Sequence, residues 1–305
     1  MTPVGPLRIG VDLGGTKIEA VVLGPGGQVL ARQRVATPRD YEGTLQAVAG
    51  LVERVESEAR GTGTVGVGIP GAVSPATGLI KNANSTWLIG QALDQDLADV
   101  LGRPVRLEND ANCFALSEAV DGAGSGAAVV FGVILGTGVG GGIVVHGRPL
   151  RGAQAIGGEW GHNPLPWPSP EESPGPPCYC GQRGCIETWL SGPGLARDHE
   201  TETGTALTTH EIVAAWTKGE AEARASVDRY VNRLARGLAT VINVVDPDVI
   251  VLGGGMSNLP ELPEAVTRVL PEFVFTDETA TRVVRNHHGD SSGVRGAAWL
   301  WPEAG

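Results

Sequence analysis

Residues 7–23 read LRIGVDLGGTKIEAVVL, and this stretch decides the fold class. Two apolar runs flank Asp12 and a glycine pair, a pattern typical of two β-strands joined by a tight turn. A third apolar run at 29–35 follows the glycine-rich turn at 24–27. Strand, turn, strand, turn and strand in succession predict a β-meander at the start of the chain.

Residues 128–145 repeat this order in the sequence AVVFGVILGTGVGGGIVV. An apolar run enters a Gly-Thr-Gly turn, a second apolar run follows, and another turn comes at His146 and Gly147. The repeat is one of pattern rather than of identity. It predicts two copies of one supersecondary unit, and therefore two lobes that face one nucleotide.

The rest of the chain alternates between helical and strand patterns. Apolar spacing predicts helices near 43–59, 94–101, 111–120, 220–243, 260–270 and 292–301. Short apolar runs predict strands at 65–69, 105–107, 249–252 and 281–284. This alternation indicates the α/β class. Residues 163–177 hold seven prolines and few apolar residues, which predicts a loop.

Length and charge limit the classes of function. A chain of 305 residues favours two domains at about 150 residues each. The formal net charge of −11 argues against nucleic acid as the main partner, because phosphate backbones bind to basic faces. No apolar run approaches the ~18 residues of a membrane span, and the first residues lack the pattern of a signal peptide. We therefore expect a cytoplasmic protein that does not bind membranes.

The turn DLGGTK at 12–17 carries polar groups that a plain hairpin does not need. Its glycines let the backbone approach a phosphate closely, and its amides and the Thr16 hydroxyl can donate hydrogen bonds. Asp12 can hold a hydrated Mg²⁺. The chain contains no Gly-Lys pair for a P-loop, and its G-x-G-x-x-G matches lack the strand–turn–helix context of a dinucleotide site. We predict a phosphate-binding turn, with an ordinary Gly-Gly hairpin as the alternative.

Glu108, Asn109 and Asp110 end a predicted strand and open a predicted helix. Asn and Asp are common N-caps, so a purely local role accounts for either residue. A carboxylate at the carboxyl end of a strand is also well placed for chemistry in an α/β sheet. The residues alone leave both interpretations open.

His162 and the cysteines at 178, 180 and 185 form a complete Cys₃His set for structural Zn²⁺. The alternative is a group of unrelated buried thiols, which three cysteines within eight residues make improbable. In a chain with no secretory signal, such a cluster indicates metal binding before disulfides. The isolated Cys113 lies on a predicted helix and is expected in the core.

Together these motifs resemble the ROK (repressor, open reading frame, kinase) family of sugar kinases over essentially the whole chain. The run C-x-C-G-x-x-G-C-x-E at 178–187 and the E-x-x-H at 159–162 are similar to the signature of that family. Segments 82–87, 161–167 and 288–299 are similar to the bacterial fructokinase (mannofructokinase) branch.

The resemblance implies an actin/hexokinase-type (ribonuclease H-like) duplicated α/β fold, with two lobes around a nucleotide and sugar cleft. It implies a smaller N-terminal lobe at 1–120, completed by a C-terminal helix at 292–305. The larger lobe would span 121–291 and carry the zinc loop.

The resemblance also implies the roles of individual residues. Asp110 would be the general base. The cofactors would be structural Zn²⁺ on His162, Cys178, Cys180 and Cys185, and Mg²⁺ with ATP. The sugar would contact Asn84, Asn109, Asp110, Glu159, His162 and Glu187. ATP would contact Asp12, Gly14, Gly15, Thr16, Lys17, Gly136, Thr137, Gly138, Gly254 and Gly255.

The expected reaction is the transfer of the γ-phosphate of ATP to a hexose, with fructose as the first-choice substrate. Mannose, glucose and N-acetylhexosamines are the alternatives within the family. A non-catalytic sugar-binding protein or a sugar-sensing repressor is the alternative of another class. A repressor would need a DNA-binding segment before the first phosphate turn, and we expect none. A homodimer is expected on general grounds.

Overall fold

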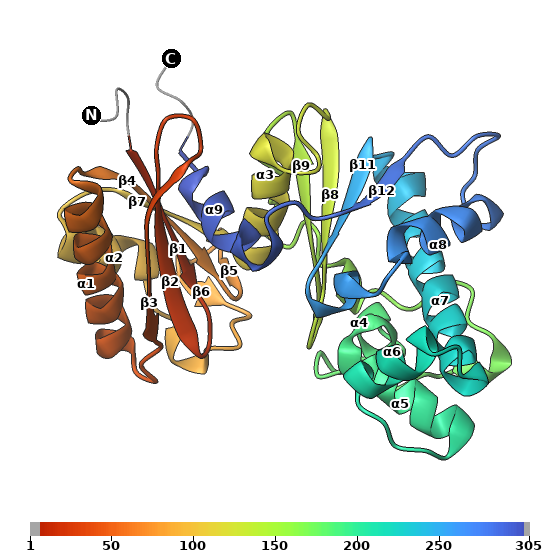
Figure 1. Cartoon of the computed structure of the whole chain (residues 1–305). Helices are drawn as coiled ribbons and strands as arrows, with labels where there is room; N and C mark the ends of the chain where they lie inside the picture. Colours follow the sequence, from red (N-terminus) through yellow and green to blue (C-terminus); the bar gives the residue numbers. More distant parts are fainter. Residues whose placement is uncertain (1–6, 302–305) are drawn as a thin grey trace. The chain divides into compact units, whose positions relative to one another are not determined.

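The computed structural model describes residues 7–301 (Figure 1). These residues divide into two compact units. The first comprises 7–126, 142–157 and 290–301, and the second comprises 127–141 and 158–289. The predicted lobe boundaries stay a prediction, and residues 1–6 and 302–305 of the predicted first lobe lie outside the described residues.

Two five-stranded sheets share one topology. The first has the order β3-β2-β1-β4-β7, and the second has the order β10-β9-β8-β11-β12. In the first sheet β1 pairs antiparallel with β2 and parallel with β4. In the second, β8 pairs parallel with β11, which pairs parallel with β12. The meander repeat predicted from the sequence is therefore confirmed.

The strands of the first sheet are β1 (Leu7–Leu13), β2 (Lys17–Leu23), β3 (Val29–Ala36), β4 (Gly63–Ile69) and β7 (Val105–Asn109). Those of the second are β8 (Val129–Leu135), β9 (Val139–Val145), β10 (Arg148–Pro149), β11 (Val249–Gly253) and β12 (Arg282–Arg285). A short ribbon pairs β5 (Ala72–Val73) with β6 (Ile80–Lys81).

The helices of the first unit are α1 (Tyr41–Ala59), α2 (Leu93–Leu101), α3 (Asp110–Asp121) and α9 (Ser292–Ala298). Apolar side chains of α1 and α2 pack with those of β1, β2 and β4 into one core. The other side of the sheet packs against α9, which also contacts α3 (Figure 1). A Cβ at Gly66 would collide with the carbonyl oxygen of Ala297, and one at Gly296 with that of Cys113. Glycine at both positions therefore permits the close approach of α9.

The helices of the second unit are α4 (Ile186–Leu190), α5 (Gly192–Thr203), α6 (Thr209–Thr217), α7 (Ala221–Val245) and α8 (Leu262–Val269). Short 3₁₀ turns are η1 (Thr86–Leu88), η2 (Trp160–His162), η3 (Pro170–Glu172), η4 (Gly255–Asn258), η5 (Leu270–Glu272) and η6 (Gly289–Ser291).

Helices α4, α5 and α6 were absent from the sequence prediction. Helix α5 begins GPG, which is typical of a turn, but Ser191 caps it by accepting a hydrogen bond from Gly194 N, and Pro193 lies in its first turn. Helix α6 begins with a capping box between Thr208 and Glu211. Caps rather than apolar periodicity define these short helices.

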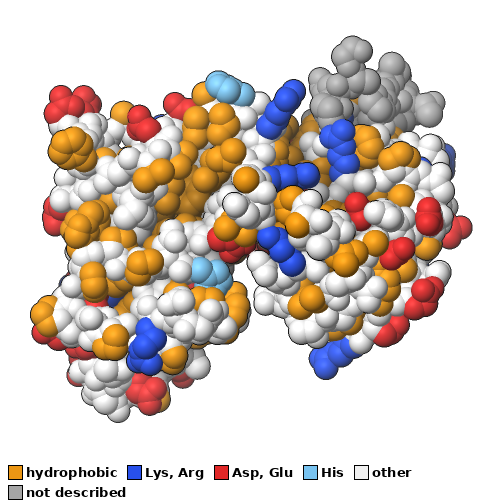
Figure 2. All heavy atoms as spheres, turned by 180° about the vertical axis from the view of Figure 1, so that it is seen from behind, with side chains coloured by type: hydrophobic (Ala, Val, Ile, Leu, Met, Phe, Trp, Pro, Cys, Tyr) orange, Lys and Arg blue, Asp and Glu red, His pale blue; other side chains and the backbone are white. Residues whose placement is uncertain are grey.

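Two surface properties bear on the expected partners. Within residues 7–301, no helix combines the length and the apolar character that crossing a membrane requires. On the face drawn in Figure 2, several lysine and arginine side chains lie near the middle of the view, and others stand among acidic and neutral side chains.

Candidate active site

The turn between β1 and β2 has a fixed backbone and an exposed rim. Gly14 N donates to Lys17 O at 3.1 Å, which closes the turn. Thr37, just after β3, donates from Oγ1 to Gly14 O at 2.7 Å and from its amide to Thr16 O at 3.1 Å. Gly15, Thr16 and Lys17 are exposed. The predicted phosphate turn is thus held rigid from one side, and its tip is accessible.

Asp12 lies at the end of β1 in an unfavourable setting for a negative charge. Burial, together with the charges of Asp110 and Glu19 and against the opposing effect of Lys17, raises the pKa of its carboxyl to about 6. Asp12 and Asp110 are therefore close enough to repel each other. A largely buried carboxylate with a second carboxylate nearby fits a hydrated Mg²⁺, which prefers such oxygen ligands and would remove this repulsion.

Replacing Asp12 with Asn should stabilise the metal-free protein at pH 8 by roughly 1–3 kcal/mol and abolish Mg²⁺-dependent activity. The folded pKa of about 6 exceeds the usual 3.8, so the folded state binds more protons than the unfolded state between these values. The free energy of unfolding of the wild type therefore falls as pH rises through that window. Asn does not titrate, so the gain should shrink when the pH is lowered to about 4.

Urea denaturation in EDTA at the two pH values measures this difference. Asp99→Asn, an exposed substitution on α2, is the control and should change little at either pH. A gain for Asp12→Asn that is the same at both pH values would exclude the titration of Asp12 as its cause.

Asn109 caps α3 and braces a neighbouring loop. Its Oδ1 accepts from Ala111 N at 2.9 Å and Asn112 N at 3.3 Å, and its Nδ2 donates to Gly71 O at 3.1 Å. The capping interpretation is therefore confirmed for Asn109. Because a side-chain amide has two N–H donors, one of them is left for a ligand.

Asp110 is the first residue of α3, and its Oδ1 accepts from Ala111 N at 2.8 Å. A helix N-terminus favours a negative charge at this position. Asn84 lies exposed in the loop between β6 and η1, within the same unit. The first unit thus supplies Asp12, the phosphate turn, Asn84, Asn109 and Asp110.

The Gly136–Gly138 turn of the second unit is braced by a predicted sugar ligand. Gly136 N donates to Gly138 O at 2.9 Å, and Gly136 O accepts from Gly192 N at 2.8 Å. Glu187 Oε2 accepts from Val139 N at 2.9 Å. A Cβ at Gly138 would stand 2.6 Å from the same carboxylate oxygen. Glu187 therefore fixes the turn, in addition to any contact with a sugar.

A pocket of about 540 Å³ adjoins this turn. Gly136 and Thr137 line it together with Gly255, so two of the predicted nucleotide segments meet there. Gly254 has φ +80° and a Cβ there would approach Leu135 O to 2.5 Å, which only glycine permits. The sequence prediction missed the rest of the lining, which comes mainly from the starts of α5 and α6: Gly192, Pro193, Thr208, Thr209, His210, Val213, Met256, Asn258 and Leu259.

Glu159 and His162 flank η2, which a buried tryptophan fixes to the second unit. Trp160 Nε1 donates to Gly140 O at 3.2 Å, and its ring meets Phe131 edge-on at 5.6 Å. Glu159 is exposed, and His162 is partly buried. Sequence reasoning did not assign a role to Trp160, which sets the direction of both neighbours.

The four predicted zinc ligands lie together. Their ligand atoms are all within 4.8 Å of one another. Cys178 Sγ stands 3.5 Å from His162 Nδ1, and Cys180 Sγ stands 3.6 Å from Cys185 Sγ. Ligands around a tetrahedral zinc with Zn–S of about 2.3 Å and Zn–N of about 2.0 Å would be about 3.5–3.8 Å apart. The cluster therefore has the dimensions and the donor set of a zinc site.

The second nitrogen of His162 already has a partner. Its Nε2 lies 2.9 Å from the hydroxyl of Tyr179, which is 77% exposed at the tip of the cysteine hairpin. The resemblance implied that His162 contacts the sugar as well as zinc, and that sugar contact stays a prediction. A sugar would have to replace the tyrosine or share the nitrogen's hydrogen bond with it.

The proline-rich loop at 163–177 runs between the cysteine hairpin and α7. Leu165 N donates to Gly184 O at 2.9 Å. Arg236 of α7 donates to Trp167 O at 2.7 Å and to Glu172. Burial opposes the charge of Glu172, but hydrogen bonds from Arg236 and Arg233 outweigh it and lower the pKa of Glu172 to about 2. These contacts define the path of a segment that the sequence predicted only as a loop.

Comparison with known proteins agrees with this arrangement. The family model described as the ROK family matches residues 8–304. The chain belongs to the ROK family. It is 43% identical over 296 residues to an N-acetyl-D-glucosamine kinase of Escherichia coli O139:H28 (strain E24377A / ETEC), covering 95% of this chain and 98% of that protein. The predicted resemblance to ROK sugar kinases is confirmed.

Solved ROK structures confirm the fold. The chain matches a ROK hexokinase from Thermus thermophilus with a TM-score of 0.85 and 36% identity, over 96% of this chain and 97% of the other. It matches a ROK glucokinase from Streptomyces griseus, solved with glucose and AMPPNP, with a TM-score of 0.77 and 30% identity, over 96% and 98% of the two chains. The predicted actin/hexokinase-type α/β fold is therefore correct. None of these relatives supports the predicted fructokinase branch.

Proposed function

We propose that this ROK protein is an ATP-dependent hexose kinase whose preferred substrate is N-acetylglucosamine. The observation that supports the kinase activity is the position of Asp12 on β1, beside the phosphate turn, with Asp110 at the start of α3 near enough for its charge to raise the pKa of Asp12. Kinases commonly use one carboxylate to hold the metal and another to accept the proton of the substrate hydroxyl. The relative that is 43% identical, an N-acetyl-D-glucosamine kinase, supports the choice of sugar.

In this proposal, some residues of the chain would position the substrates and others would take part in proton transfer. When bound, ATP with Mg²⁺ supplies the phosphoryl group and neutralises its charge. The turns at 14–17 and 136–138 would bind its phosphates, and Gly254 and Gly255 would bind its nucleoside. Asp12 would hold the metal through its hydration shell.

The polar side chains at the sugar would match its hydroxyls. These are the side chains of Asn84, Asn109, Asp110, Glu159, His162 and Glu187. Asp110 would orient the attacking hydroxyl, position 6 by analogy with the family, and accept its proton late in the reaction. Such a weak base suffices because phosphoryl transfer has a loose transition state, in which positioning and charge stabilisation supply most of the rate.

An ADP-release assay with ATP·Mg²⁺ and four sugars tests this proposal. We expect the highest kcat/KM with N-acetylglucosamine, followed by glucose and mannose. Fructose is the second candidate, because segments 82–87, 161–167 and 288–299 are similar to the fructokinase branch. A reaction without sugar measures background ATP hydrolysis.

Each result of that assay has a distinct meaning. A higher kcat/KM with fructose would retain the kinase and overturn the N-acetylglucosamine assignment. If no sugar stimulates ADP release from zinc-replete protein, the kinase proposal fails, and a non-catalytic sugar-binding protein becomes the better explanation.

A further inference from the structure

Glu108 is a buried carboxylate directly before the Asn109–Asp110 pair. Glu108 is the last but one residue of β7 and is 7% exposed. Oε1 accepts from the backbone amide of Asn109 at 3.0 Å and from Nδ2 of Asn112 at 3.0 Å. Asn112 is itself buried on the first turn of α3. One carboxylate oxygen thus ties the end of β7 to the beginning of α3.

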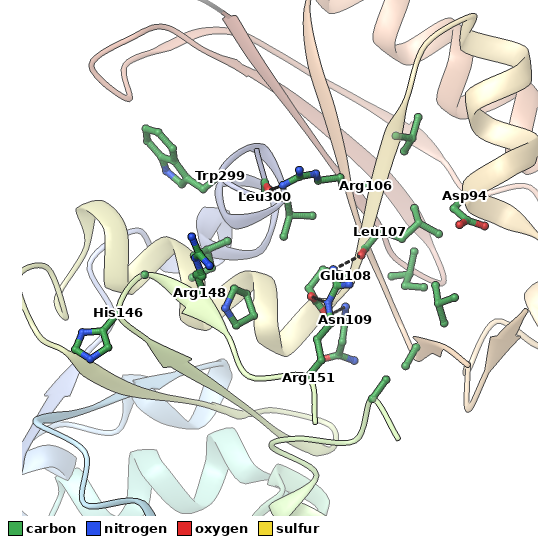
Figure 3. A pocket seen from close by; sticks show the side chains of 18 residues that line it. Asp94, Arg106, Leu107, Glu108, Asn109, His146, Arg148, Arg151, Trp299 and Leu300 are labelled. Atoms are coloured by element: carbon green, nitrogen blue, oxygen red, sulfur yellow. Dashed lines mark hydrogen bonds and ion pairs between the residues drawn. The ribbon is translucent and has the colours of Figure 1, made fainter. Parts of the chain in front are cut away.

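The other oxygen of Glu108 is held by Arg151. Arg151 Nε lies 2.5 Å from Glu108 Oε2, and Arg151 Nη2 donates to Leu107 O at 3.1 Å (Figure 3). Arg151 follows β10 in a segment that belongs to the same unit as β7 and α3. The side chain of Arg151 is 57% exposed. Arg151 and Glu108 both line a pocket of about 730 Å³, which leaves the arginine accessible.

A buried carboxylate is costly unless charge and hydrogen bonds compensate it. Here three donors from three residues occupy both oxygens of Glu108, so its position is fixed. The amide of Asn109 is fixed with it, and the next residue in the chain is Asp110. We propose that Glu108 and Arg151 are positioning residues that set the orientation of Asp110. This inference rests on the proposed kinase activity of the same site.

Stability and catalysis should respond to this pair by very different amounts. Arg151 is 57% exposed but Glu108 is buried, so removing the arginine should destabilise the fold by roughly 1–2 kcal/mol, while the two hydrogen bonds to Oε1 remain. A catalytic group displaced by about 1 Å can slow its reaction by about 100-fold. Arg151→Ala should therefore remain folded and still turn over much more slowly than the wild type.

Replacing Arg151 with Ala should lower kcat about 10- to 100-fold and change the KM for the sugar by less than about threefold. The matched control is Arg148→Ala. Arg148 lines the same pocket three positions earlier, and the described part of the chain shows no bond between it and Glu108. Arg148→Ala should retain the wild-type kcat and melting temperature, and Arg151→Ala should melt no more than about 8 °C below the wild type, so that it is still folded in the assay.

Chemical rescue gives a readout that a purely structural role would not produce. The pocket is open enough to admit a guanidinium ion once the Arg151 side chain is removed. Added methylguanidinium should therefore restore kcat of Arg151→Ala by several-fold in a saturable manner, whereas equal concentrations of NaCl or methylammonium should not. Arg151→Lys should retain an intermediate kcat, because it keeps the charge and loses the paired geometry.

Glu108→Gln tests the other partner, since it preserves the shape of the side chain and removes its charge. If the two residues act through their ion pair, the double variant Arg151→Ala/Glu108→Gln should have a kcat no lower than that of the slower single variant. The inference is overturned if Arg151→Ala turns over like Arg148→Ala, or if NaCl restores its activity as well as methylguanidinium does. A wild type without sugar-dependent activity would instead contradict the proposed function.

Discussion

Replacing Asp110 with Asn should lower kcat about 10²- to 10⁴-fold while the sugar still binds. Asn keeps an Oδ1 that can accept the hydrogen bond from Ala111 N, so the start of α3 is retained. What is lost is the carboxylate that, in the proposed mechanism, would take the proton of the attacking hydroxyl. Steady-state kinetics gives kcat, and titration calorimetry with N-acetylglucosamine gives the sugar Kd, which should change by less than about tenfold.

A second measurement checks the position of Asp110 independently of the reaction. The charge of Asp110 is one of the causes that raise the pKa of Asp12. In Asp110→Asn the pKa of Asp12 should therefore fall below the wild-type value of about 6, as carboxyl NMR would show. Asp99→Asn on α2 should leave both kcat and this pKa unchanged. An Asp110→Asn enzyme within about tenfold of the wild-type kcat would exclude Asp110 as the general base.

The sequence was sufficient for features whose parts lie close together in the chain. The two meanders, the DLGGTK turn and the cysteine hairpin each occupy fewer than thirty consecutive residues, so periodicity and spacing describe them. The alternation of strands and helices then predicted the class of fold. Asn109 shows the limit of this approach, because one side chain is both a helix cap and a proposed sugar ligand.

Contacts between distant residues escaped the sequence analysis. Thr37 holds the phosphate turn from the end of β3, and its position follows from the pairing of Lys17 with Ala36. Arg151 pairs with Glu108, which lies forty-three positions earlier in the sequence. The residues around neither side chain predict this pair. Helices α5 and α6, which line the pocket beside the Gly136–Gly138 turn, are short and lack a clear apolar stripe. Such features depend on tertiary packing, which overrides local preference.

The zinc cluster carries the largest expected effect on stability. The purified protein should contain about one zinc per chain, and Cys178→Ser should lose most of it, because a structural site needs all four ligands. The melting temperature should fall by about 5–10 °C, a fraction of the full value of a structural zinc site. Cys113→Ala is the matched control: this buried thiol belongs to the first unit and the cluster to the second, so its loss should leave the zinc content intact.

Loss of zinc should disturb the cysteine hairpin at 178–185 locally, because other bonds hold the proline-rich loop at 163–177. Glu172 remains paired with Arg233 and Arg236 when the cluster opens, whereas the hairpin at 178–185 is joined to the loop by backbone hydrogen bonds such as that from Leu165 N to Gly184 O. Hydrogen exchange should therefore accelerate at 178–187 and stay unchanged in α3. Because His162 would both ligate zinc and contact the sugar, chelation should also raise the KM for the sugar several-fold. If the zinc-free protein has an unchanged KM for the sugar, zinc stabilises the fold and does not affect sugar binding.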